Sequence, residues 1–132
     1  MEITNAASRP LKPFHSVAIP VLVPGQTLPT DRGLDAEVVL LWPYSSSTRR
    51  AAILISEHDF RLRRHKGQVR VQLRGPAAQA LAESHISIGD HVHIELEGAR
   101  WADEADRVAV TAPGRAIDGE LVFERELHIK VR

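Results

Sequence analysis

The sequence predicts an all-β domain with one short helix, built as a five-stranded Greek-key barrel. Short apolar segments recur with strand-like alternation, and turn-forming residues separate them. One helix-forming segment lies between the third and fourth predicted strands. A chain of 132 residues is long enough for one domain with a hydrophobic core and too short for two ordinary ones.

The first 35 residues are predicted to form a Pro-rich extension that packs on the barrel, and residues 36–132 the barrel domain itself. Five prolines in the extension interrupt helices and would disrupt a central strand. They are Pro10, Pro13, Pro20, Pro24 and Pro29. The run over residues 17–23 is apolar enough to lie across a core surface.

The first two strands are predicted over residues 37–42 and 49–56, since both segments are apolar and rich in β-branched residues. Residues 43–48 form a Ser-rich loop between them, because Pro43 ends the first strand. Residues 57–66 form a charged connection.

The third strand, over residues 67–74, shows the clearest alternation in the chain. A period of two predicts one buried face and one solvent face. The buried face is expected to carry Val69, Val71 and Leu73, and the solvent face Gln68, Arg70, Gln72 and Arg74.

A short helix is predicted over residues 76–84, which begin with proline and continue with good helix formers. Strands follow over residues 91–96 and 121–131. A long loop between them, residues 98–119, is expected to hold Trp101 and a short strand at residues 108–110.

The predicted element order, three strands, a helix and two strands, is the layout of an OB-fold. An OB-fold binds its ligand across the second and third strands and through the loops that follow the first and fourth strands. The Ser-rich loop and the basic third strand both fall on that surface.

Charge is unevenly distributed although the formal net charge is zero. Residues 49–74 contain eight basic and two acidic residues, and residues 75–106 contain one basic and seven acidic residues. Such a dipole can attract a polyanion to one side of the domain. The alternative is that both segments form ordinary solvated faces.

Residues 40–75 combine aromatic, hydroxyl and basic side chains at short spacing, which suits a single-stranded nucleic acid. Aromatic rings stack on unpaired bases, at about 1–3 kcal/mol each, and hydroxyls and arginines contact phosphates or base edges. The predicted nucleic-acid-binding residues are Trp42, Tyr44, Ser45, Ser46, Thr48, Arg49, Arg50, Arg61, Arg63, Lys66, Gln68, Arg70, Gln72 and Arg74. Alternatives remain for each group: Trp42 as a core residue, the hydroxyls as a flexible turn, and the strand face as plain solvated surface.

No catalytic, metal or cofactor site is predicted. His91 and His93 lie two residues apart without an evident third ligand, and His58, Asp59 and His65 have no nucleophile placed for them. The absence of cysteine excludes disulfides and favours an intracellular compartment. No apolar run approaches the roughly 18 residues that span a membrane, so no membrane association is expected.

Four motifs resemble the N-terminal OB-fold of the protection-of-telomeres and telomere end-binding proteins, fungal type. They are LWPYSSST at residues 41–48, DFRLR at 59–63, GQVRVQL at 67–73 and IGDHV at 88–92. The resemblance implies binding of G-rich single-stranded telomeric DNA in the nucleus, at chromosome ends, without catalysis, and with other telomere-complex proteins as further partners. The alternative is an OB-fold protein-interaction module, in which the basic hairpin docks an acidic partner with Trp42 and Phe60 as anchors.

Overall fold

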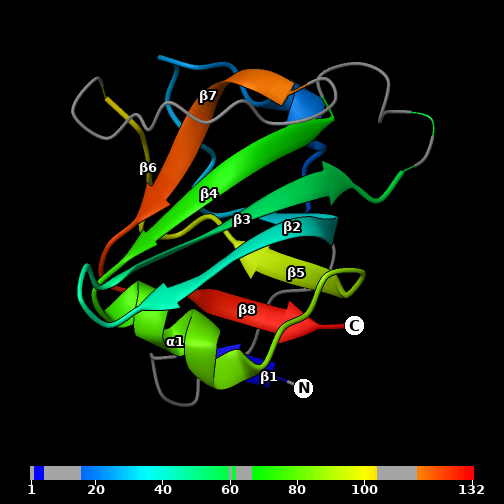
Figure 1. The fold of residues 1–132 in the computed structure, drawn as a ribbon. Helices are drawn as coiled ribbons and strands as arrows, with labels where there is room; N and C mark the ends of the chain where they lie inside the picture. The colour runs from blue at the N-terminus through cyan, green and yellow to red at the C-terminus, as the bar shows by residue number, and fades with distance from the viewer. Residues whose placement is uncertain (1, 5–15, 60, 62–66, 104–115) are drawn as a thin grey trace.

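The computed structural model describes residues 2–4, 16–59, 61, 67–103 and 116–132 (Figure 1). Within these ranges the chain forms eight strands, one α-helix and one 3-10 helix. In chain order they are β1 (Glu2–Thr4), η1 (Ile19–Val21), β2 (Gly33–Ser45), β3 (Arg50–Glu57), β4 (Gln68–Arg74), α1 (Pro76–Ser84), β5 (His91–Glu95), β6 (Ala99–Trp101), β7 (Ala116–Phe123) and β8 (His128–Val131).

The strands form one curled sheet in the order β1-β8-β5-β2-β3-β4-β7-β6. All described pairs are antiparallel except β4 with β7. β7 and β8 pair with opposite sides of the central strands, yet only residues 124–127 separate them. A link of that length spans at most about 18 Å, so the two sides of the sheet must come together there. Figure 1 shows this curl, with β8 below and β7 above the central strands.

The arrangement is mostly β with one helix and is compatible with an OB-like fold, but the predicted count of five strands is wrong. The segment predicted as one strand over residues 121–131 is divided into β7 and β8, and β1 and β6 add short strands at the two ends of the sheet. The strand predicted at residues 108–110 lies outside the described residues.

The helix α1 is confirmed at the predicted bounds. Gly75 precedes it at φ 53°, ψ −127°, a conformation that essentially only glycine adopts, and His85 ends it in the left-handed region. The helix contacts β4, β2 and β3, and it buries Ala77, Ala78, Ala80 and Leu81. In the described ranges no helix is long and apolar enough to cross a membrane.

The hydrophobic core lies inside the curl. Val69, Val71 and Leu73 are buried there as predicted, with exposed fractions of 1% or less. The segment before β2 also contributes to this core, through Ile19, Leu22 and Leu28. The division of the chain into an extension and a barrel domain stays a prediction.

The first predicted strand and its loop differ from the structure. β2 begins at Gly33 and continues through Pro43 to Ser45, so the turn into β3 comprises only residues 46–49. The register of β2 against β3 shifts between Trp42 and Ser45. A bulge of this kind tolerates proline, because the residue there does not need to donate a ladder hydrogen bond.

Candidate nucleic-acid interface

The polar face of β4 does not face solvent as its alternation predicts. Arg70 is 7% exposed and Gln72 is 5% exposed. β4 is a central strand, with β3 on one side and β7 on the other, and Arg70 lies directly opposite Glu120 of β7. Alternation therefore identified the two faces of β4, but it did not show that both are covered.

Arg70 is held by an aromatic ring and a carboxylate. Its guanidinium lies 4.8 Å from the centre of the Trp42 ring, and its Nη1 donates to Glu120 Oε1 at 3.4 Å. Gln72 Nε2 donates to the other oxygen of Glu120 at 2.5 Å. Arg70 Nε and Gln68 Oε1 are buried and have no hydrogen-bond partner among the described residues. This buried network ties β4 to β7 and uses Arg70, Gln72 and one face of Trp42 internally.

The aromatic and hydroxyl residues before the turn are placed differently from one another. Tyr44 is partly buried and packs against the hydrophobic core. Ser45 and Ser47 share a hydrogen bond between their hydroxyls at 3.0 Å, whereas Ser46 and Thr48 are exposed. The turn thus presents hydroxyls to solvent, while the Tyr44 ring contributes to packing.

Three arginines meet where the β2–β3 turn joins the end of β4. Arg50 and Arg74 are direct cross-strand partners, and Arg49 lies in the turn at φ 55°. The turn is bonded to the end of β4, because Gly75 N donates to Arg49 O at 2.9 Å. Arg49 and Arg50 are exposed, and neither has an acidic partner in the described part of the chain. Like charges placed directly opposite each other are destabilising, and an anion between them would relieve this repulsion.

A fourth arginine lies beside this cluster. Arg100 of β6 donates to Glu124 Oε1 at 2.8 Å, and Arg74 Nη1 lies 3.8 Å from the same oxygen. Arg74 also donates to Gln72 Oε1 at 3.4 Å. We name Arg49, Arg50, Arg74 and Arg100 the basic end of the sheet. In Figure 1 it lies to the left, where the β2–β3 turn and the ends of β4 and β7 converge.

The remaining basic candidates lie after β3. Arg61 is exposed, and its side chain holds Asp59 in a forked contact of 3.2 and 3.3 Å. These hydrogen bonds from Arg61 lower the pKa of the Asp59 carboxyl. Arg63 and Lys66 lie outside the described residues. The structure therefore brings Arg49, Arg50 and Arg74 together, and it leaves Arg61 in a local ion pair.

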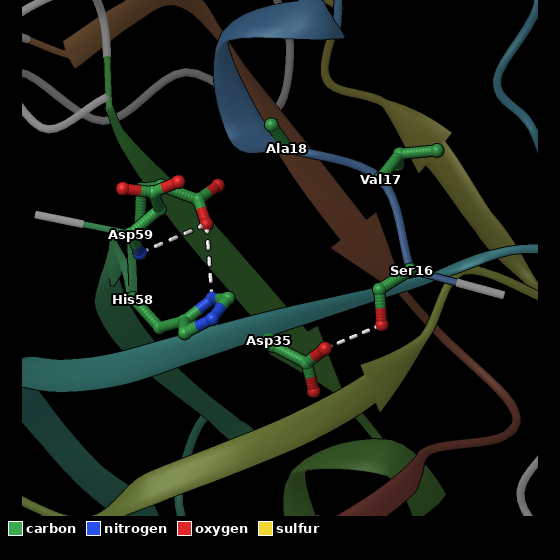
Figure 2. Close-up of a pocket in the computed structure, with 7 residues that line it drawn as sticks. Ser16, Val17, Ala18, Asp35, His58 and Asp59 are labelled. Carbon is green, nitrogen blue, oxygen red and sulfur yellow. Dashed lines mark hydrogen bonds and ion pairs between the residues drawn. The ribbon is translucent and has the colours of Figure 1, made fainter. Parts of the chain in front are cut away.

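A small pocket of about 180 Å³ opens at the other end of β3 (Figure 2). It is lined by Ser16, Val17, Ala18, Asp35, Glu57, His58 and Asp59. Glu57 is 3% exposed and accepts hydrogen bonds from Ile19 N at 2.7 Å and Asp59 N at 3.3 Å, and it contacts His58 Nδ1 at 3.2 Å. Its carboxylate is therefore satisfied by the protein itself.

The second carboxylate of this pocket is also satisfied. Asp35 accepts a hydrogen bond from the Ser16 hydroxyl, and it contacts His93 Nδ1 at 2.8 Å and Arg132 Nη2 at 3.1 Å. Burial alone raises the pKa of Asp35, but the hydrogen bonds from His93 and Ser16, with the charges of His93 and Arg132, outweigh it and lower the pKa to about 2. Because the Ser16 hydroxyl bonds Asp35 rather than the imidazole, the set does not form an activated nucleophile.

The two histidines of β5 do not converge. His91 is more than half exposed, whereas His93 is 2% exposed and lies against Gly33, where a Cβ would come within 2.5 Å of its Nε2. Among the described residues no group of three metal-ligating side chains forms.

Sequence reasoning missed Glu120, Glu124 and Arg100, three residues that define the neighbourhood of β4. They are brought there by the pairing of β7 with β4 and of β6 with β7. The one available signal was that Arg100 is the single basic residue of an otherwise acidic segment.

Comparisons with known proteins add one family and one structure. No curated protein matches the chain. Among solved structures, the chain is similar to Schizosaccharomyces pombe Pot1pC bound to ssDNA (CGGTTACGGT), with 15% identity, a TM-score of 0.48, and coverage of 84% of this chain and 85% of that one. A family model described as "Domain of unknown function (DUF8502)" matches residues 7–132. The chain belongs to the DUF8502 family.

Proposed function

We propose that this domain binds single-stranded nucleic acid at the basic end of its sheet, with arginines on the phosphates. The observation that carries the proposal is the placement of Arg49 and Arg50, which are exposed and have no acidic partner in the described residues, beside Arg74. Converging positive charges attract a polyanion, and the planar guanidinium matches the geometry of a phosphate. The exposed hydroxyls of Ser46 and Thr48 add donors at the same turn.

The finer proposals follow the resemblance of the four sequence motifs. The ligand is G-rich telomeric DNA, the protein acts at chromosome ends in the nucleus, and it binds without catalysis. β7 and β8 together serve as the fifth strand of an OB barrel, since they are consecutive in the chain and pair with β4 and β5. In that barrel the β2–β3 turn is the loop after the first strand, where an OB-fold binds its ligand.

A second candidate is docking of an acidic protein segment on the same arginines. The observation that favours it is the internal use of the aromatic rings: Tyr44 packs against the core, and Arg70 covers one face of Trp42. A nucleic-acid site usually adds stacking platforms to its cations. A carboxylate-rich protein segment could bind through the arginines without any exposed aromatic ring.

The test is fluorescence anisotropy with G-rich, C-rich and scrambled single strands of about 12 nucleotides, a length within the usual site size. The doubly substituted Arg49→Gln/Arg50→Gln protein is expected to bind about tenfold more weakly than wild type. Arg32→Gln is the matched control, because Arg32 precedes β2 whereas the arginine cluster follows it. It removes one positive charge, half of what the double substitution removes, and is expected to change affinity less than twofold.

Preference for G-rich strands supports the telomeric proposal, and equal binding of all strands supports a general single-strand binder. No binding by folded wild type at about 50 mM salt contradicts both, since phosphate contacts are strongest at low salt. An acidic peptide that binds under those conditions then selects the docking candidate.

A further inference from the structure

Glu124 lies between two arginines at the edge of the basic end. Its Oε1 is 2.8 Å from Arg100 Nη2 and 3.8 Å from Arg74 Nη1. Arg100 comes from β6 and Arg74 from β4, the two neighbours of β7 in the sheet. One carboxylate oxygen thus faces two guanidinium groups from different strands, an arrangement that one phosphate oxygen can reproduce.

The backbone of Glu124 lies close to the end of β4, and its side chain is half exposed. It is the first residue after β7, and its carbonyl oxygen lies 3.6 Å from the position a Cβ would take on Gly75, directly after β4. The side chain of Glu124 is 49% exposed and that of Arg100 is 39% exposed. The Arg74 side chain is less exposed, at 22%, but the shorter contact, from Glu124 to Arg100, is an exposed ion pair. Exposed ion pairs contribute little to stability, so exchanging the carboxylate on Arg100 for another anion costs little.

We propose that the Arg74–Arg100 pair is a phosphate subsite which Glu124 occupies in the free protein and which a phosphodiester group of the ligand takes over on binding. The proposal rests on the proposed function for its natural ligand. It extends the path of the ligand from the β2–β3 turn across the end of β4 to β6, and it makes Glu124 a competitor that weakens phosphate binding. Each binding event must first displace this carboxylate, so weakly held anions are rejected.

The first experiment compares Glu124→Gln with Glu126→Gln by anisotropy on a single-stranded oligonucleotide. Glu126 lies two residues further along the same link, is similarly exposed, and contacts His128 at 3.1 Å instead of an arginine. Both substitutions remove one negative charge, so each raises the net charge by one unit. Glu124→Gln is expected to raise affinity about three- to tenfold and to steepen the salt dependence, whereas Glu126→Gln is expected to change affinity less than twofold. Adding Arg100→Gln to Glu124→Gln should remove most of the gain.

The second experiment uses inorganic pyrophosphate as the probe and the guanidinium NMR signals of Arg100 as the readout, so it does not depend on nucleic acid. Glu124→Gln should shift these signals at a several-fold lower pyrophosphate concentration than wild type or Glu126→Gln. If the three proteins respond at the same concentration, or if both Gln variants gain equally on the oligonucleotide, the competing role of Glu124 is wrong. If pyrophosphate gives the expected difference while no oligonucleotide binds, the subsite stands and the proposed function fails.

Discussion

The two ends of β3 carry opposite charges, and they differ in whether the protein itself supplies partners for those charges. At the Glu57 end, each of the three carboxylates of the pocket receives hydrogen bonds from the protein: Glu57 from Ile19 N, Asp35 from Ser16, and Asp59 from Arg61. At the Arg50 end, Arg50 faces another arginine across the ladder and has no acidic partner in the described ranges. The comparison teaches that a charge whose partners the fold supplies serves the structure, whereas Arg49 and Arg50, which have no acidic partner among the described residues, are available to a ligand.

Arg70 extends the comparison to a single strand face. It lies four residues before Arg74 on β4, yet its guanidinium is buried between Trp42 and Glu120. Two arginines of the same strand face therefore differ in role: Arg70 is part of a buried structural network, whereas Arg74 belongs to the basic end of the sheet. The predictions below test that division, beginning with the largest expected effect.

Removing the partner of Arg70 should destabilise the fold strongly. Glu120→Ala leaves Arg70, which is 7% exposed, without this carboxylate, and it removes the Glu120 oxygen that accepts a hydrogen bond from Gln72. Breaking a buried ion pair costs about 3–5 kcal/mol of unfolding free energy. Urea denaturation measures the loss, with Glu83→Ala on the exposed side of α1 as a control expected to stay within about 0.5 kcal/mol. A loss below about 1 kcal/mol for Glu120→Ala would mean that the network is not structural.

Gly33→Ala should destabilise the Glu57 end of the sheet by about 1–3 kcal/mol through overpacking. The added methyl would lie 2.5 Å from His93 Nε2 and 3.0 Å from Ile94 O, and the imidazole cannot easily move because it is 2% exposed and bonded to Asp35. Thermal unfolding measures the loss. If Gly33→Ala leaves the stability unchanged, the packing of His93 against Gly33 is less tight than the distances indicate.

The partners of Asp35 should make the fold sensitive to acid. The pKa of Asp35 is about 2 in the folded protein, against an ordinary value of 3.8. The carboxylate therefore stabilises the fold fully above about pH 4, and this contribution is lost as the pH falls towards 2. Its size is about 1–2 kcal/mol once solvent screening is allowed for.

Denaturation series at several pH values check this expectation. The stability difference between wild type and Asp35→Asn should shrink as the pH falls from about 4 to 2, because protonation removes the same charge from wild type. A difference that stays constant over that range would contradict a stabilising role for the ionised carboxylate.

Arg50→Gln should have the smallest effect on stability and the opposite sign. It removes one of two like charges that lie directly opposite each other, so unfolding free energy should rise by about 0.2–1 kcal/mol in the absence of ligand. The same change should weaken nucleic-acid binding. Gain of stability with loss of affinity is the signature expected of a binding residue. If Arg50→Gln lowers both the stability and the affinity, Arg50 has a structural role instead.

Local pattern predicted part of this molecule well. The bounds of α1 and the buried face of β4 followed from proline placement and strict alternation. The burial of Arg70 did not follow, because the covering carboxylate, Glu120, comes from a strand 50 residues away. The packing of Tyr44 against the core did not follow either, because its place beside a Ser-rich turn is visible in sequence but this contact is not. Stacking of Tyr44 on a base stays a prediction.

The salt dependence of single-strand binding tests the central claim most directly, because it counts phosphate contacts. Each phosphate contact on a single strand contributes about 0.7 to the slope of log affinity against log salt. We expect Arg49→Gln/Arg50→Gln to reduce the slope of wild type by about 1.4, and Arg32→Gln to leave it unchanged. Equal slopes for wild type and the doubly substituted protein would contradict the claim that Arg49 and Arg50 hold the ligand.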